Sequence, residues 1–397
     1  MKIIHSSDWH LGHTLHGYDR REEQESMLAQ MEEIVRSELP DLFLVSGDVF
    51  DVSQPSSAAQ RMFVDTVMRL HAAHPGMAIV ITAGNHDSGS RHEIFRTPMK
   101  EFGVELVGTL QSGSPEDHII ELPGKGFLVA LPYAHERNIP EGFIQSVLDF
   151  ANERNTGQLP VVMMAHTTVK GCDFTGHKSV LTASSEGEAR EPISIGGIDG
   201  TPVENMGEGY DYLALGHIHK PQFVHTGKHN VRYSGSPLAV SFDEDYAHSV
   251  TMVEIEKHGD IPKLTQIEIK NPWPLVTLPP EGTADWATAR DLLQNFPDNQ
   301  QAYIRLNVMV TDFLPPEANE EAYAITEGKS CRFCLINSKR EREADHTHRE
   351  MTLSEFRNQN PEDIAKIFIE ESGGTFDEEM LEMFRMATAR LNEEEKK

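Results

Sequence analysis

Five short apolar segments of this chain end in residues that can bind metal ions, and this repetition constrains the fold more than any other feature. Three of the segments end shortly before Asp8, Asp48 and Asn85, and the other two end at His166 and His217. Short apolar runs of this kind are typical of buried strands. Because the carboxyl ends of parallel strands meet at one edge of a sheet, we expect these side chains to form a single site.

The candidate ligands are carboxylates, an amide and imidazoles, which are the groups that bind pairs of divalent metals of hard or borderline character. The predicted set is Asp8, His10, Asp48, Asn85, His166, His217 and His219. A carboxylate has two oxygens, so Asp48 is the predicted bridge between two metals. Alternate residues of an extended segment point the same way, which predicts that Asp8 and His10 face one centre. The same argument applies to His217 and His219.

A pair of divalent metals would suit the chemistry of phosphate esters, because it neutralises charge on the phosphate and lowers the pKa of bound water. The departing alkoxide still needs a proton or a positive charge, and His86, next to Asn85, is the predicted donor. We expect the carboxylate of Asp51 to orient His86 through a hydrogen bond. Donors without a thiolate suit manganese, iron or zinc, whereas a structural zinc site usually has four ligands rich in cysteine.

These motifs occur in the order found in the calcineurin-like metallophosphoesterases, which this chain resembles. Within that superfamily it is similar to the SbcD family of nuclease subunits. The resemblance rests on Ser6-Ser7-Asp8-Trp9-His10-Leu11-Gly12, Gly47-Asp48-Val49-Phe50-Asp51, Gly84-Asn85-His86-Asp87, His166, Ala214-Leu215-Gly216-His217-Ile218-His219, Val231-Arg232-Tyr233-Ser234-Gly235-Ser236-Pro237 and Ser241-Phe242-Asp243-Glu244. It implies an α/β fold of the α/β/β/α sandwich type and two metal ions, with manganese favoured. It also implies that His217 and Asn85 serve one metal, and that His219 serves the other together with the Asp8-x-His10 motif.

The resemblance implies a metal-dependent DNA nuclease, with double-strand exonuclease and hairpin or single-strand endonuclease activity in DNA replication, recombination and repair. Such a subunit would form a homodimer and would be the catalytic part of an ATP-driven complex with an SbcC-type ATPase that carries coiled coils. The alternative is a nucleotide or small-molecule phosphodiesterase on the same fold. A protein phosphatase is not favoured, because Val52-Ser53 follows Asp51 where that branch has Arg-Gly. The complete ligand set argues against an inactive scaffold.

The net charge is unusual for a protein that binds DNA. The chain has 35 Lys and Arg against 63 Asp and Glu, a formal charge of −28, which gives no general attraction to a polyanion. Bound cations and a partner subunit would have to supply positive charge. Four residues after the first motif, His13, His16, Arg20 and Arg21, either contact phosphate or lie in a solvated loop.

The element pattern divides the 397 residues into three predicted regions. Residues 1–271 alternate strands and helices, with amphipathic helices at 20–38 and 57–71, and form the nuclease domain. Pro272-Trp273-Pro274 marks a boundary, and residues 272–345 form a small α+β capping domain. Its expected strands are at 275–278, 302–310 and 331–337, and its expected helices at 285–295 and 316–326.

Residues 346–397 are predicted to form two short helices, at 361–371 and 378–392, whose apolar stripes dock on the coiled coils of the ATPase. The polar, glycine-rich stretch 171–209 is either a loop that faces the substrate or a disordered excursion.

Three cysteines, Cys172, Cys331 and Cys334, do not form the framework of a secreted domain. No signal peptide fits the first residues, and no apolar run reaches the roughly 18 residues of a membrane span, which predicts a cytoplasmic protein without a membrane partner.

Overall fold

The computed structural model describes residues 1–174, 200–224, 229–311, 313–340 and 380–381. The chain divides into two compact units, Met1–Glu341 and Arg342–Lys397. Most of the predicted docking segment 346–397, and residues 175–199 of the glycine-rich stretch, lie outside the described residues. The predictions for these two segments, and the predicted domain boundaries, therefore stay predictions.

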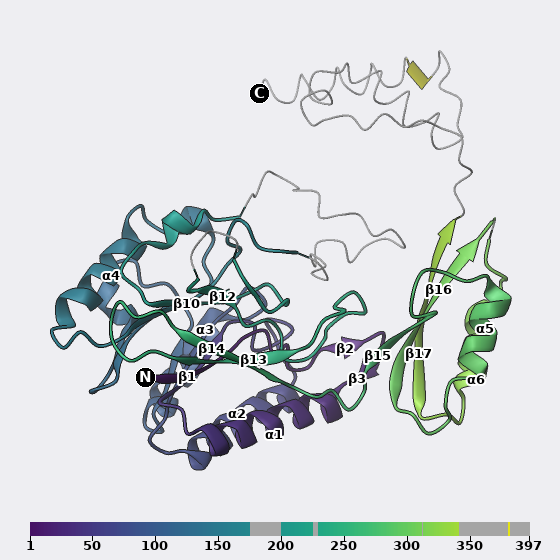
Figure 1. Cartoon of the computed structure of the whole chain (residues 1–397), viewed down its shortest axis with the longest axis horizontal. Helices are drawn as coiled ribbons and strands as arrows, with labels where there is room; N and C mark the ends of the chain where they lie inside the picture. The colour runs from purple at the N-terminus through teal and green to yellow at the C-terminus, as the bar shows by residue number, and fades with distance from the viewer. Residues whose placement is uncertain (175–199, 225–228, 312, 341–379, 382–397) are drawn as a thin grey trace. The chain divides into compact units, whose positions relative to one another are not determined.

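Two six-stranded sheets pack face to face at the centre of the first unit (Figure 1). The first sheet has the order β14-β13-β1-β4-β5-β6 and the second β11-β12-β10-β9-β8-β7. The strands of the first are β1 (Lys2–Ser6), β4 (Leu42–Ser46), β5 (Ala78–Thr82), β6 (Val104–Val107), β13 (Ser249–Glu254) and β14 (Lys263–Glu268). Those of the second are β7 (Ile119–Leu122), β8 (Gly126–Leu131), β9 (Val161–His166), β10 (Tyr212–Gly216), β11 (Gln222–Phe223) and β12 (Val231–Tyr233).

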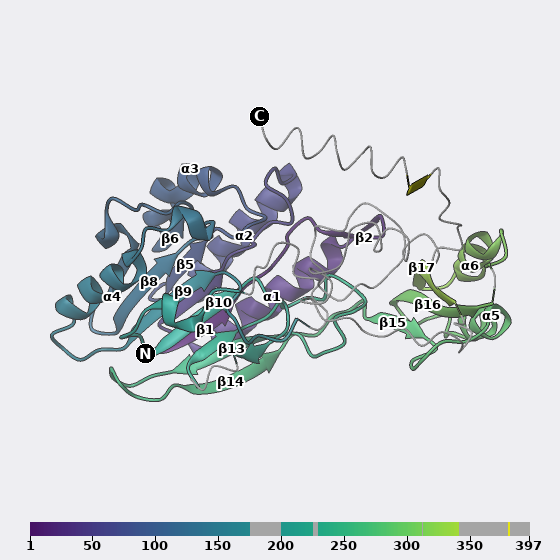
Figure 2. The ribbon, with the colours of Figure 1, turned by 90° about the horizontal axis from the view of Figure 1, so that it is seen from above.

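Hydrophobic side chains fill the space between the sheets and beneath the helices that cover them. Leu44 and Val80 of the first sheet share one buried cluster with Val162 and Ala214 of the second. The helices α1 (Arg21–Glu38), α2 (Ser57–Ala73) and α3 (Gly89–Lys100) cover the outer face of the first sheet, and α4 (Phe143–Arg154) covers that of the second (Figure 2). This layering confirms the predicted α/β/β/α sandwich. The predicted amphipathic helices correspond to α1 and α2.

The short described elements of this part are β2 (Thr14–Leu15), β3 (Tyr18–Asp19) and the 3₁₀ helices η1 (Pro115–His118), η2 (Glu136–Asn138) and η4 (Val203–Met206).

A smaller sheet with its own hydrophobic core follows Trp273. Its elements are β15 (Leu275–Leu278), α5 (Trp286–Gln294), β16 (Ala302–Val310), α6 (Ala318–Thr326) and β17 (Cys331–Arg340), which is the predicted order. All three strands are parallel, so α5 and α6 are crossover helices. The side chain of Asp285 accepts a hydrogen bond from the Thr288 amide at 2.8 Å and caps α5.

Aromatic and charged side chains join this smaller sheet to α1. The Tyr303 hydroxyl donates to Glu23 Oε1 at 2.7 Å, and Arg20 Nε lies 3.2 Å from the same oxygen. The guanidinium carbon of Arg332 lies 3.9 Å from the ring centroid of Trp273. Arg20 is only 1% exposed. The expectation that Arg20 contacts phosphate or lies in a solvated loop was therefore wrong, because its guanidinium group is buried and forms an ion pair with Glu23.

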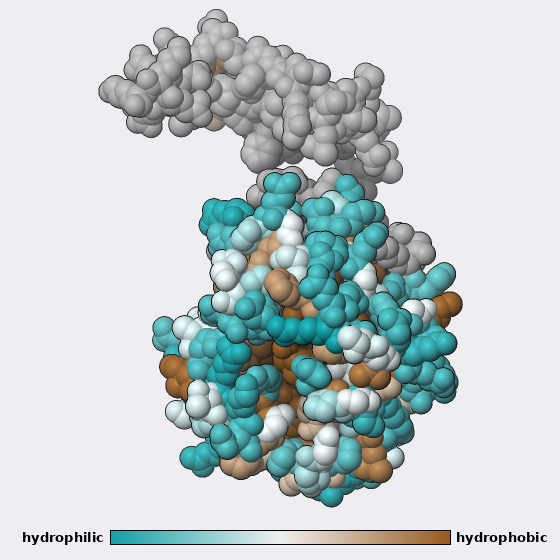
Figure 3. Space-filling model, turned by 90° about the vertical axis from the view of Figure 1, so that its left-hand side faces the viewer, coloured by the Kyte–Doolittle hydropathy of each residue, from teal (hydrophilic) through white to brown (hydrophobic). Residues whose placement is uncertain are grey.

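The face seen in Figure 3 is mostly hydrophilic, around a hollow where hydrophobic residues are visible. Among the described residues, no helix has both the length and the apolar character that crossing a bilayer requires.

Candidate metal centre

All the predicted site residues lie at one edge of the sandwich, where parallel strands of both sheets end. Asp8 and His10 follow β1, Asp48 and Asp51 follow β4, Asn85 and His86 follow β5, His166 is the last residue of β9, and His217 and His219 follow β10. The strands β1, β4 and β5 run parallel in the first sheet, as β9 and β10 do in the second. Because the two sheets are stacked, five strand ends converge on one point.

The backbone at these residues is not extended. Asp8 has a φ of 52°, His10 of 46°, Asp48 of 49° and His217 of 101°. These left-handed conformations are rare outside glycine and cluster at functional sites. The prediction that an extended segment aligns Asp8 with His10, and His217 with His219, was therefore wrong in its reasoning. Tight turns directly after the strands bring these side chains together instead.

One group of potential metal donors consists of Asp8, His10 and His219, whose donor atoms all lie within 4.8 Å of one another. The Nε2 atoms of His10 and His219 are 3.2 Å apart. The Ser7 hydroxyl donates to Asp8 Oδ2 at 2.6 Å and holds this carboxylate in place. All three donor residues are buried.

A second group consists of Asp48, His166 and His217. His166 Nε2 lies 3.3 Å from Asp48 Oδ2. Asn85 Oδ1 is 2.9 Å from His166 Nε2 and 2.9 Å from His217 Nδ1, so the amide belongs to this group. Asp48 Oδ2 is also 4.0 Å from His10 Nε2, which places this carboxylate between the two groups.

The electrostatics of the centre favour cations. Burial alone would lower the pKa of His10, but hydrogen bonding to Asp51 and the charges of Asp48 and Asp8 outweigh it and raise that pKa to about 9. Burial and the charge of Asp48 oppose each other in the same way at His166, whose pKa rises to about 9. The aspartates thus draw positive charge to this point, and two oxygen and imidazole donor groups beside one carboxylate fit a pair of divalent ions.

Asp51 contacts His86 through its main-chain carbonyl oxygen and not, as predicted, through its carboxylate. His86 Nδ1 lies 2.7 Å from the main-chain carbonyl oxygen of Asp51. A carbonyl oxygen can only accept, so Nδ1 is protonated and donates this hydrogen bond. The carboxylate of Asp51 instead lies 3.3 Å from Nδ1 of His10. The predicted hydrogen bond between this carboxylate and His86 was therefore wrong, because the side chain turns towards the buried ring of His10. The main chain of Asp51 still orients His86, and it leaves Nε2 of that ring to exchange a proton.

Sequence reasoning missed two acidic residues that support the centre. Glu244 Oε1 accepts a hydrogen bond from His219 Nδ1 at 3.0 Å, across 25 residues of chain. Burial would raise the pKa of Glu244, but His219 outweighs it and holds that pKa below the usual range. Glu244 is the last residue of the motif that begins at Ser241, yet nothing within that segment indicates this partner.

Asp87 is the second missed residue. Its fully buried carboxylate accepts hydrogen bonds from the amides of Val49 at 3.1 Å, Phe50 at 2.9 Å and Gly84 at 2.9 Å. It thereby ties the loop after β4 to the loop after β5. In the sequence, the position of an acidic residue directly after Asn85-His86 could have indicated that it binds main-chain amides of the neighbouring loops.

Two glycines allow the strand ends to approach one another this closely. A Cβ on Gly84 would lie 2.1 Å from Asp48 Oδ1, and one on Gly216 would lie 1.8 Å from the Ser46 carbonyl oxygen. Any larger residue at either position would push the loops apart.

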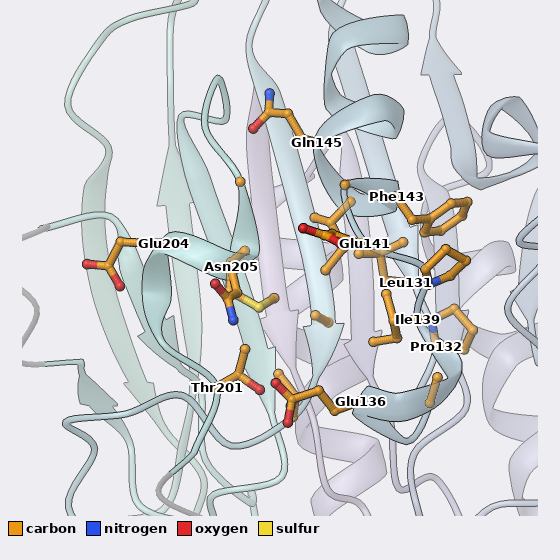
Figure 4. Close-up of a pocket in the computed structure, with 18 of the residues that line it drawn as sticks. Leu131, Pro132, Glu136, Ile139, Glu141, Phe143, Gln145, Thr201, Glu204 and Asn205 are labelled. Atoms are coloured by element: carbon orange, nitrogen blue, oxygen red, sulfur yellow. The ribbon is translucent and has the colours of Figure 1, made fainter.

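A cavity of about 470 Å³ adjoins His166, beside the ends of β8 and β9 (Figure 4). Leu131, Ile139 and Phe143 form part of its apolar wall, and Glu136, Glu141 and Glu204 are among its polar residues. No Lys or Arg is among the described residues that line it. The described lining of this cavity therefore supplies no Lys or Arg to neutralise a phosphate group.

Comparison with known proteins gives one consistent result. Residues 1–221 match the family described as calcineurin-like phosphoesterase. Three similar curated proteins are each named as the D component of the nuclease SbcCD. The one from Rhodobacter capsulatus is 33% identical over 72% of this chain and 73% of its own length. The one from Bacillus subtilis is 29% identical over 100% of both chains, and the one from Escherichia coli K12 is 26% identical over 94% of this chain and 91% of its own.

Proposed function

The chain belongs to the calcineurin-like phosphoesterases and, within them, to the SbcD nucleases, and we propose that it cuts DNA ends and hairpins with two manganese ions. The observation that carries this proposal is the position of Asp48. Its carboxylate lies 3.3 Å from His166 and 4.0 Å from His10, one residue in each donor group. Such a carboxylate can join two metal ions in one centre.

The chain's own residues would divide the metal ligands into two sets. Asp8, His10 and His219 would hold one ion, and His166, His217 and Asn85 the other, with Asp48 shared. When bound, the two ions supply positive charge for the phosphate oxygens and lower the pKa of water. Oxygen and imidazole donors without a thiolate, together with the resemblance, favour manganese over other divalent metals.

His86 is the proposed general acid. Its Nδ1–H is fixed by the carbonyl oxygen of Asp51, so Nε2 can deliver a proton to the departing alkoxide. The amide of His86 also donates to Asp48 Oδ1 at 2.8 Å, which links the position of the acid to the bridging carboxylate. His86 is half-buried and Asn85 is exposed, so the substrate would enter on this side.

The proposed partners follow from the relatives, which are named as parts of a complex called SbcCD. An SbcC-type ATPase with coiled coils would bind residues 346–397 and couple ATP hydrolysis to DNA processing in replication, recombination and repair. A cytoplasmic homodimer of this chain would form the core of that complex.

The direct test is the cleavage of end-labelled linear duplex and hairpin DNA with added manganese, with Asp48→Asn as the matched blank. Manganese-dependent cutting that disappears in Asp48→Asn is the expected result. Metal-independent cutting, or equal cutting by both proteins, would reject the proposed site.

A nucleotide or small-molecule phosphodiesterase remains the second candidate, because the net charge of −28 does not attract DNA. Rapid hydrolysis of a small phosphodiester without DNA cutting, even when the ATPase partner is present, would favour this candidate.

A further inference from the structure

The loop after β8 brings a sixth strand end to the metal centre, although no predicted ligand comes from it. β8 runs parallel to β9, with Leu131 opposite Ala165, so the residues that follow β8 emerge beside His166. The amide of Tyr133 donates to the carbonyl oxygen of Ala83 at 2.8 Å. This bond ties the loop to the first sheet, two residues before Asn85.

The ring of Tyr133 lies at the accessible rim of the centre. Its centroid is 6.2 Å from that of His166, with the planes at 83°, so the two rings meet edge to face. The ring of His135 also contacts Tyr133 edge to face, with the centroids 5.7 Å apart. Tyr133 is half-buried, like His86 and His217, whereas His166 is buried.

The hydroxyl of Tyr133 is not used in the hydrogen bonds that the described part of the chain makes. Among the described residues, no hydrogen-bond partner is found for its hydroxyl, while Tyr212 and Tyr303, which are buried, both have one. A tyrosine kept in place by its main chain, with a partly open ring and an unused hydroxyl, is suited to contact a ligand.

The charge of the chain indicates which part of a DNA substrate this ring would contact. With 63 acidic against 35 basic residues, the side chains offer no net positive charge to hold phosphates away from the metal centre, and three glutamates are among the residues that line the cavity beside His166. A nucleobase is neutral and has a flat π-face, so an aromatic ring can hold it without positive charge.

We propose that Tyr133 stacks on the nucleobase next to the scissile phosphate and so makes this phosphodiesterase selective for nucleotide substrates. This inference rests on the proposed function and adds the group that recognises the base. Stacking of one base on an aromatic side chain lowers the dissociation constant by about tenfold or more.

The test compares two phosphodiesters with the same leaving group, thymidine 5′-p-nitrophenyl phosphate and methyl p-nitrophenyl phosphate, hydrolysed by the full-length protein with manganese. Tyr133→Leu should lower kcat/KM for the thymidine ester by about tenfold, mainly through KM, and leave the methyl ester within about twofold. Tyr133→Phe should behave as the unchanged protein on both. Phe150→Leu, at a partly exposed aromatic residue of α4, is the matched control and should change neither value.

Each other outcome has a distinct meaning. Equal losses on both esters would show that Tyr133 supports the metal centre rather than a base, and would overturn the inference. A loss in Tyr133→Phe as large as in Tyr133→Leu would assign the contact to the hydroxyl and overturn stacking. No change in Tyr133→Leu would also reject the inference, while the proposed function stands. Failure of the unchanged protein on both esters and on DNA would reject the function itself.

Discussion

At the scale of the residue, the metal centre depends on which atom each side chain presents. Asp51 shows this clearly, since its carbonyl oxygen binds His86 while its carboxylate faces His10. The identity of a residue therefore indicates that it belongs to the site, but not which of its atoms acts.

His86→Ala should stop cleavage with little effect on metal binding, because His86 is placed to deliver a proton rather than to hold an ion. We expect kcat to fall by about 10²- to 10⁴-fold, the usual contribution of a general acid. Metal content measured on the same preparation should stay close to that of the unchanged protein. Asp48→Asn is the contrasting control, which should lose metal and activity together. A parallel loss of metal in His86→Ala would contradict the catalytic role.

Glu244→Gln should weaken manganese binding, because the carboxylate orients the ring of His219, a proposed metal ligand, and would make it a stronger donor. Loss of such a partner typically costs about 10- to 100-fold in metal affinity. A manganese titration of activity should show a higher half-saturating concentration, with kcat largely restored at saturation. Unchanged manganese dependence would show that Glu244 merely fills space beside His219.

At the scale of the element, the tight turns after the strands set the positions of the donor side chains, which regular extended strands would not bring to one point. Four non-glycine residues of the site have left-handed φ values, and they follow β1, β4 and β10. Asp87 holds the loops after β4 and β5 together by accepting three main-chain hydrogen bonds. The strain of the turns is thus offset by contacts between loops that are distant in sequence.

Asp87→Ala should destabilise this part of the protein, because it leaves three amides without their acceptor. Each unsatisfied buried donor costs about 1–3 kcal/mol, so we expect the free energy of unfolding to fall by at least about 3 kcal/mol. Urea unfolding of the metal-free protein, followed by circular dichroism, measures this change. Asp117→Ala, which removes an exposed acid from η1, is the control. Similar stability of the two variants would rule out the proposed role of Asp87.

At the scale of the whole molecule, the site exists because two sheets are stacked with their parallel strand ends at the same edge. The group of Asp8, His10 and His219 and the group of Asp48, His166 and His217 each draw on both sheets: Asp8, His10 and Asp48 come from the first sheet, and His166, His217 and His219 from the second. The Tyr303–Glu23 contact attaches the smaller parallel sheet to α1, the helix that follows the His10 loop.

Deletion of residues 346–397 should abolish a stable complex with the ATPase partner while metal-dependent hydrolysis of a small phosphodiester is retained. The reason is that every proposed metal ligand and the acid His86 lie within residues 8–219. Co-purification of tagged ATPase with the full-length and shortened chains measures the complex. Equal recovery of the ATPase with both chains would reject the docking role of this segment.

Much of this protein could be predicted from its sequence because its apolar runs and turn residues are local signals. The runs before Asp8, Asp48 and Asn85 predicted buried strands, and strands that run parallel must end together. The chemical types of the ligands and the order of elements in the smaller sheet followed from such local patterns, whereas the sandwich was implied by the resemblance to the phosphoesterase family.

The tertiary structure alone decided how the donors are combined. Which histidine meets which aspartate depends on the stacking of two sheets, and the pairing of His219 with Glu244 depends on a loop that closes after the second sheet is complete. The left-handed turns at Asp8 and His10 replaced the extended segment that local reasoning favoured, because contacts between loops outweigh local backbone preference. Sequence therefore determined the residues of the centre, and packing determined their geometry.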